Sequence, residues 1–136
     1  MTQGVWLPVD PASKVALERL QEKGPLRLPP EYIDQLAASD GGEGDLGVQP
    51  GWIVLWPADE VLAHNAGYSV SEFLPGFFGF GSNGGGELLA FDIRGSEPYP
   101  IVMVPFIPME VGEAVRIASS FGELRNQIGK LSKSDT

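Results

Sequence analysis

The segment Trp52–Trp56 constrains the possible folds more than any other part of the chain. Its five residues are all apolar, and Gly51 and Pro57 bound the run. A short apolar run between two such residues is typical of a β-strand that is buried on both faces. We therefore expect the chain to build a β-sheet with other elements packed against both of its sides.

The order of the remaining elements predicts an α+β fold. We expect two helices before this strand, one from Asp10-Pro11 to Gly24 and one from Pro29-Pro30 to Asp40. Further strands and a final helix should follow, which favours one curved, mixed or mostly antiparallel sheet flanked by helices at both ends of the chain. The other expected elements are a loop at 43–51, a short helix at 57–65, strands at 77–80, 88–93 and 99–106, a short strand at 115–117, and a helix that begins at the Ser120–Glu123 capping box.

The length of 136 residues indicates a single domain, with a core from about residue 11 to 129 and a frayed tail at 130–136. The chain has no cysteine, which excludes disulfides, thiolate zinc sites and cysteine nucleophiles. The first ten residues lack the basic and apolar regions of a signal peptide. We therefore expect a cytoplasmic protein.

Charge is distributed unevenly along the chain. The net charge is −9, and no Lys or Arg occurs between Arg27 and Arg94. Such a surface repels nucleic acid and anionic membranes, so neither is an expected partner. Two interpretations stay open: a docking face for a basic protein, or a solubilising surface. The acids of this stretch are Glu31, Asp34, Asp40, Glu43, Asp45, Asp59, Glu60, Glu72, Glu87 and Asp92.

Residues that could carry chemistry are few, and we assign no catalytic residue, cofactor or metal. His64 is the only histidine, and no Gly-x-Ser-x-Gly elbow accompanies it. The segment 79–84 matches a dinucleotide-binding fingerprint, but a strand follows it where that motif requires a helix. Asp40, Glu43 and Asp45 do not have the spacing of an EF-hand. A carboxylate-based hydrolase or small-ligand site near Trp56 and Phe78 ranks last among the alternatives.

Four phenylalanines lie close to the glycine-rich loop at 81–86, and most of them should belong to the core. One or two of these rings, such as Phe78, could instead lie exposed beside Glu43 or Glu87. An aromatic ring next to a carboxylate is a common form of protein-binding hot spot. The four are Phe73, Phe77, Phe78 and Phe80.

Several short motifs follow one another in an order that resembles the SUKH superfamily. This group includes bacterial toxin-immunity proteins and fungal regulators of cell-wall synthesis. The resemblance covers about residues 28–128. It is carried by Leu28-Pro29-x-x-Tyr32, Leu36, Gly41-Gly42-Glu43, Trp56, Glu60, Asn65, Tyr68, Gly81-Ser82-Asn83-Gly84-Gly85-Gly86-Glu87, Ala90-Phe91-Asp92, Ser120-Phe121, Glu123 and Leu124.

The resemblance implies a protein-binding role without catalysis, most simply an immunity protein that neutralises a basic nuclease or deaminase toxin. A cytosolic scaffold or regulatory protein unrelated to toxins is the alternative. The partner's identity and the oligomeric state stay open. Candidate contacts are Glu43, Asp45, Glu87, Asp92 and Phe78, and the residues expected to have structural roles are Gly41, Gly42, Trp56, Tyr68, Gly84, Gly85, Gly86 and Phe121.

Overall fold

A computed structural model describes residues 3–25 and 27–132, and it confirms the α+β class. The strands form one sheet in which every neighbouring pair is antiparallel and the spatial order follows the sequence. The strands are β1 (Trp6–Leu7), β2 (Gly42–Asp45), β3 (Trp52–Leu55), β4 (Phe77–Ser82), β5 (Glu87–Asp92), β6 (Ile101–Pro105) and β7 (Val115–Ala118).

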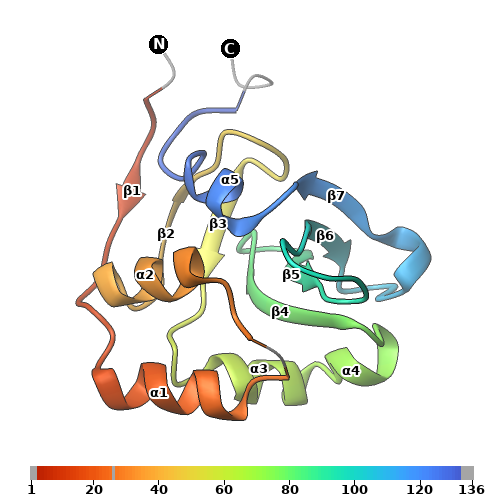
Figure 1. The fold of residues 1–136 in the computed structure, drawn as a ribbon. Coiled ribbons are helices and arrows are strands. Elements are labelled where there is room, and N and C mark those ends of the chain that lie inside the picture. Colours follow the sequence, from red (N-terminus) through yellow and green to blue (C-terminus); the bar gives the residue numbers. More distant parts are fainter. Residues whose placement is uncertain (1–2, 26, 133–136) are drawn as a thin grey trace.

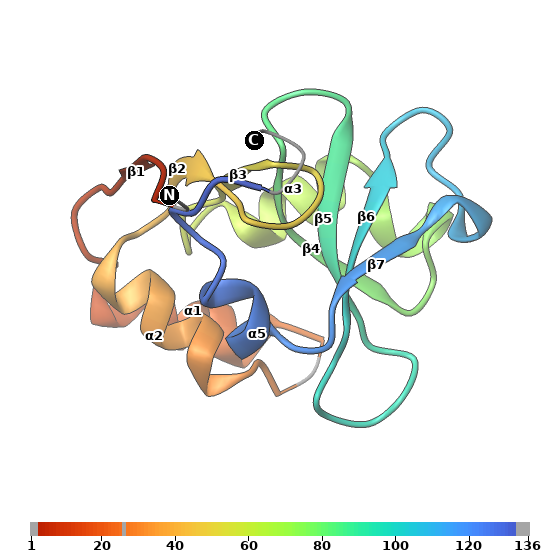
Figure 2. The ribbon, with the colours of Figure 1, turned by 90° about the horizontal axis from the view of Figure 1, so that it is seen from above.

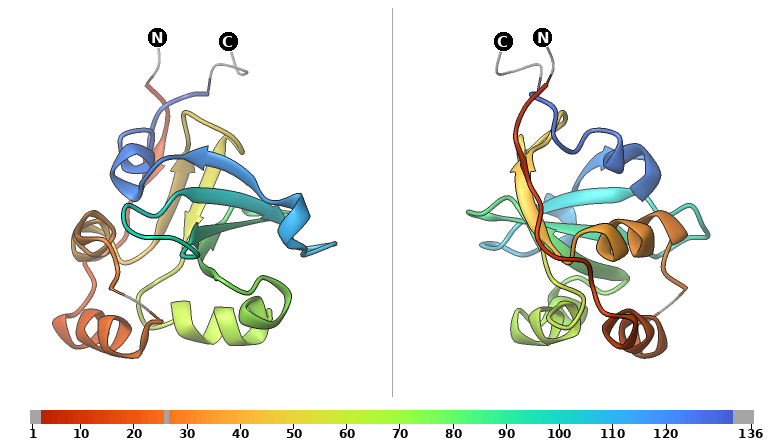
Figure 3. Two further views of the ribbon diagram at one scale, coloured as in Figure 1. Left: turned by 45° about the vertical axis from the view of Figure 1, so that its right-hand side comes forward. Right: turned by 90° about the vertical axis from the view of Figure 1, so that its left-hand side faces the viewer.

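Helices from both ends of the chain and from its middle cover this sheet (Figure 1). Figure 3 shows α2 and α5 on one side of the sheet and α3 on the other. Strands β4–β7 run across the direction of β1–β3, as Figure 2 shows from above, so the sheet is strongly twisted. The helices are α1 (Lys14–Lys23), α2 (Pro30–Ala38), α3 (Val61–Gly67), α4 (Val70–Phe73), the short 3-10 turn η1 (Val111–Glu113) and α5 (Phe121–Arg125).

A cluster of four buried aromatic rings holds α2 and α5 to the middle of the sheet. The Tyr32 ring lies 5.2 Å from both Phe91 and Phe121, and Phe80 lies 4.8 Å from Phe91. Each of these rings is at most 1% exposed. Burial, and to a smaller extent the charge of Asp40, raises the pKa of Tyr32, so its phenol stays neutral.

The expected strand at Trp52–Trp56 exists, but the expectation that both of its faces are buried is wrong. Ile53 and Leu55 are buried in the core, whereas Trp52 and Val54 are only half-buried on the opposite face. The reason is that, within residues 3–25 and 27–132, no helix packs over the face of β2 and β3 that carries Glu43, Asp45, Trp52 and Val54. We call this surface the outer face.

Two short strands lie where no strand was expected. The segment predicted as a loop at 43–51 begins with β2, which pairs with β1 on one side and β3 on the other. The sequence of β2, Gly-Glu-Gly-Asp, shows no alternation of apolar and polar residues, so no local pattern predicts a strand there. Gly44 permits the close approach to β1, because a side chain there would collide with the carbonyl oxygen of Val5.

Two helices begin later in the chain than expected. The first helix begins at Lys14 instead of Pro11, because Ser13 Oγ accepts a hydrogen bond from Ala16 N and caps it. The third helix begins at Val61, four residues after Pro57. The cap at Ser120 is confirmed: its hydroxyl accepts from Glu123 N at 3.1 Å.

The two ends of the described chain lie together. Gly4 N donates to the carbonyl of Gly129, and Gly129 N donates to that of Asp45. Lys130 forms an antiparallel bridge with Gln3, and Ser132 is buried. Residues 130–132 of the tail expected at 130–136 are therefore packed, and the rest of that tail lies outside the described residues.

We predict that Asn65→Ala lowers the free energy of unfolding by about 1–3 kcal/mol, because it removes three partly buried hydrogen bonds. Asn65 Nδ2 donates to the carbonyls of Val61 and Gly79, and Asn65 Oδ1 accepts from Gly79 N, each at 2.8 Å. The two bonds to Gly79 fasten α3 to β4. Urea unfolding measures the change. Asn126→Ala, at the end of α5, is the control and should cost clearly less.

Candidate partner-binding surface

The loop Asn83–Gly86 between β4 and β5, called here the glycine loop, is ordered by its own side chains. Asn83 Oδ1 accepts from Gly85 N at 2.9 Å and from Glu87 N at 3.0 Å. Ser82 Oγ accepts from Gly84 N at 3.1 Å. Gly84 has a φ of +78°, a conformation that glycine adopts without strain. The expected hairpin loop is therefore present, and it is held in a defined shape.

The glycine loop connects two surfaces of the molecule. On one side Gly84 lies against β3, where an added methyl group would lie 3.4 Å from Val54 and 3.6 Å from Trp52. On the other side the carbonyl of Gly86 accepts from Phe106 N at 2.8 Å. The loop thereby joins the outer face of β2 and β3 to the segment that follows β6.

Two carboxylates lie on the outer face beside a tryptophan. Glu43 is exposed, and its Oε2 accepts a hydrogen bond from Trp52 Nε1 at 3.1 Å. Asp45 Oδ2 accepts from Val5 N at 2.7 Å. The strand register places both acids on the same face as Trp52 and Val54. A shallow pocket of about 310 Å³ beside them is lined by Leu7, Pro8, Val9, Gly42, Glu43, Val54 and Leu55.

An aromatic stack continues on the other side of the glycine loop. Trp56 lies 4.6 Å from the His64 ring, and Tyr68 lies 4.7 Å from Phe106. His64 and Tyr68 are stacked at 6.2 Å. His64 Nε2 is 3.3 Å from Glu60 Oε1 one helical turn earlier. Trp56 and Tyr68, expected as structural residues, therefore pack α3 against the segment after β6.

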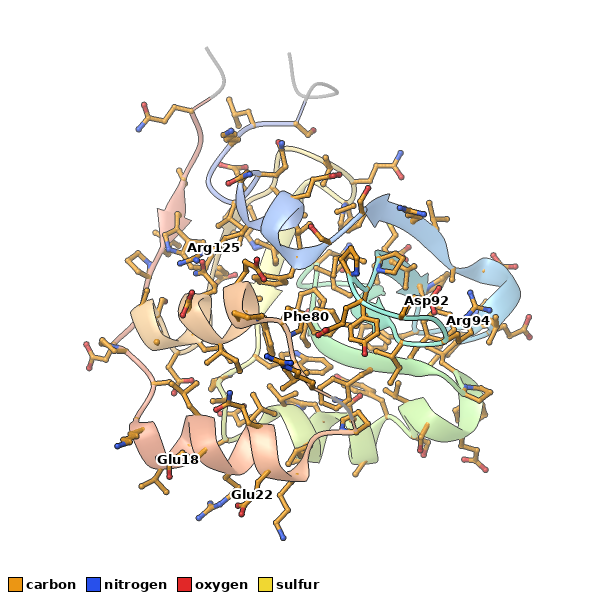
Figure 4. All side chains as sticks on the ribbon, viewed as in Figure 1. Glu18, Glu22, Phe80, Asp92, Arg94 and Arg125 are labelled. Carbon is orange, nitrogen blue, oxygen red and sulfur yellow. The ribbon has the colours of Figure 1, made fainter. Side chains whose placement is uncertain are left out.

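Asp92 differs from the other candidate contacts because its charge is neutralised within the chain. Arg94 Nε and Nη2 donate to its two oxygens, each at 2.9 Å. The two labelled side chains lie close together in Figure 4. The hydrogen bond and charge of Arg94 lower the pKa of Asp92. The Arg94 guanidinium also lies 4.7 Å above the Phe77 ring. Asp92 is thus a poor candidate for contact with a basic partner.

Two further candidates do not lie where the hypothesis required. Phe78 is only 5% exposed and belongs to the core, so it cannot form an exposed hot spot. Leu88 pairs with Ser82, which pairs with Val54 and so shares the face of Glu43. Glu87 precedes Leu88 and therefore projects from the opposite face of the sheet. The central acids thus do not form one shared patch.

Several expected structural residues have a visible reason for their identity. Gly41 and Gly42 have φ values of +100° and +101°. A side chain at either would press on a backbone carbonyl, that of Leu55 for Gly41 and that of Leu7 for Gly42. Phe121 is a member of the aromatic cluster. Asp40 Oδ1 accepts from Ala58 N at 2.7 Å, so this acid orders the chain before α3.

The alternative catalytic or small-ligand site was expected near Trp56 and Phe78. The pocket beside Phe78 is lined by Lys23, Pro25, Asn65, Ala66, Ser71, Phe77 and Phe78, with no carboxylate among these residues. No group of three or more potential metal ligands occurs within residues 3–25 and 27–132. In the same ranges, no helix has the length and apolarity needed to cross a bilayer.

The fold and this surface define a small α+β domain with an open antiparallel sheet and an exposed face of acidic and aromatic residues. The chain belongs to the SMI1/KNR4 family (SUKH-1), whose model matches residues 11–127. This match confirms the resemblance found in the sequence and extends it to include the first helix. The family includes immunity proteins. A comparison with curated proteins found no match.

Sequence reasoning missed two contributors to this surface, Trp52 and Phe106. Both lie in segments that were expected as strands, and no local pattern shows which side of a strand stays uncovered. Glu43 and Asp45, two acids from the stretch without cations, lie together on the outer face, and their role as partner contacts stays a prediction. The sheet register was needed to separate these two from Glu87.

We predict that Asp92→Asn lowers the free energy of unfolding at pH 7 by about 1 kcal/mol, through loss of the ion pair with Arg94. Because folding lowers the pKa of Asp92, its contribution is present above the ordinary value near 3.8 and is lost as the pH falls through the folded value. The difference from wild type should therefore shrink below about pH 4. Urea unfolding at pH 7 and pH 3 measures it.

The matched control is Glu18→Gln on α1, since Glu18 forms no ion pair within the described residues. This change should have little effect at either pH. An Asp92→Asn effect of equal size at pH 7 and pH 3 would contradict the assignment to the ion pair.

Proposed function

We propose that this chain is a non-enzymatic binding protein of the immunity type, which neutralises a basic toxin domain, such as a nuclease or deaminase, by direct contact. The proposal joins the family assignment to the electrostatics of the outer face. Binding through a rigid face requires no movement of the sheet. The contact surface on this proposal is Glu43, Asp45, Trp52, Val54 and the glycine loop.

The observation that carries the proposal is that Glu43 is exposed without a neutralising cation. Within residues 3–25 and 27–132, Arg94 forms an ion pair with Asp92, and His64 Nε2 lies 3.3 Å from Glu60 Oε1. In the same ranges, the indole of Trp52 is the hydrogen-bond partner of the Glu43 carboxylate. A carboxylate beside an aromatic ring on an uncovered strand offers both charge attraction and apolar area to a basic partner.

A scaffold or regulatory role unrelated to toxins is the second candidate. The same uncovered face supports it, because an acidic and aromatic face can bind a basic protein of either kind. The two functions differ in the partner: an immunity protein binds the product of a neighbouring toxin gene, and a scaffold protein binds a protein encoded elsewhere.

We predict that the chain co-purifies with a basic protein encoded beside its gene, and that the association rate falls steeply with added salt. Glu43→Lys should lower the association rate at least about tenfold at low salt, because it reverses the charge on the outer face. Stopped-flow or surface plasmon resonance measures both effects. Glu87→Lys, on the opposite face of the sheet, should have a smaller effect.

Glu18→Lys is the matched control, since it makes the same charge change on α1, away from the outer face (Figure 4). If Glu18→Lys and Glu43→Lys slow association equally, the effect is one of net charge and the docking face is refuted. A neighbour-encoded partner that associates equally fast at low and high salt would also contradict the electrostatic mechanism.

A further inference from the structure

An apolar groove lies between the end of α3, α4 and the segment that links β6 to η1. It has a volume of about 480 Å³. One wall is formed by Tyr68 and Phe73, and the other by the consecutive residues Phe106–Glu110. The groove lies next to the glycine loop, because Phe106 N donates to the carbonyl of Gly86.

The groove exposes large apolar side chains to solvent. Ile107 is 92% exposed, Phe73 is 54% exposed and Tyr68 is 44% exposed. A contiguous patch of exposed apolar side chains on a folded domain often marks a site of contact with another molecule. The aromatic floor is also fixed in place, since Tyr68 is stacked on His64 and packed 4.7 Å from Phe106.

The charges around the groove indicate what covers it. Glu110 lines the groove, Glu72 precedes Phe73 on α4, and the residues that line the groove include no Lys or Arg. Between Arg27 and Arg116 the sequence contains one Lys or Arg, Arg94, and its guanidinium is bound to Asp92. Both walls therefore come from chain segments without a free cation.

A second copy of this chain is a poor occupant. The net charge of −9 repels another copy, and a symmetric contact would bring Glu110 and Glu72 close to the same residues of its partner. A segment with apolar side chains flanked by Lys or Arg satisfies both the apolar walls and the acidic rim.

We propose that this groove is the apolar anchor site for a basic amphipathic segment of a protein partner. The inference rests on the proposed function, because it adds to the outer face a second contact on the other side of the glycine loop. The outer face attracts the partner by charge, and the groove buries apolar side chains such as Leu or Phe that slow dissociation. Ile107 and Phe73 are the contacts that we expect to contribute most.

The test uses a synthetic amphipathic helix of about 18 residues made only of Leu and Lys, with Leu on one face. Calorimetry or fluorescence anisotropy measures its binding to the full chain. We expect wild type to bind it and Ile107→Ser to lose at least about tenfold in affinity. Glu110→Lys should weaken binding similarly. Ile107 is almost fully exposed, so its replacement should leave stability unchanged.

Two controls make the test specific. Val15→Ser, on α1 and 63% exposed, should bind the peptide like wild type. A peptide with Glu in place of Lys should not bind. Equal affinity of wild type and Ile107→Ser for the Leu/Lys peptide would overturn the proposal, and so would equal losses for Ile107→Ser and Val15→Ser. A wild-type dimer that Ile107→Ser converts to monomer in sedimentation would show that a second copy is the occupant.

The groove proposal and the proposed function can be refuted separately. If Ile107→Ser binds the neighbour-encoded partner with the affinity and dissociation rate of wild type, the groove is refuted and the proposed function stands. If wild type binds no neighbour-encoded protein but binds the Leu/Lys peptide through Ile107, the proposed function is refuted and the anchor chemistry is supported.

Discussion

The packing of Tyr32, Phe80, Phe91 and Phe121 against one another is the interaction on which the rest of this structure depends. The four rings come from α2, β4, β5 and α5, so one cluster holds helices from both halves of the chain to the centre of the sheet. Aromatic pairs in tilted and edge-to-face arrangements add directional preference to the burial of apolar area. This cluster determines which face of the sheet α2 and α5 cover.

Because α2 and α5 pack on that face, little covers the opposite face of the sheet. The short helices α3 and α4 pack against β4, and Asn65 fastens α3 there through Gly79. In the part of the chain that the structure describes, no helix covers the outer face of β2 and β3, where Glu43 and Trp52 lie. The glycine loop then joins this face to the groove at Phe106. The proposed binding surfaces therefore lie where the helices leave the sheet and its loops uncovered.

Charge acts on this arrangement at two scales. Locally, Arg94 neutralises Asp92 and removes it from the candidate contacts. Elsewhere on the described surface, neither Glu43 nor Glu110 forms an ion pair, so both carboxylates stay uncompensated. An acidic surface with apolar sites beside it attracts a basic partner quickly and can retain it by burial, and these two contributions are separable by mutation.

The sequence by itself determined the α+β class, most of the strands, the family and the cation-free middle of the chain, because each depends on local patterns or on order along the chain. It could not determine β1 and β2, since the glycine-rich segment at 42–45 becomes a strand only through its neighbours. Nor could it separate Glu43 from Glu87 or place Phe78 in the core. Strand register and helix placement decide these points, and both depend on contacts between residues far apart in the chain.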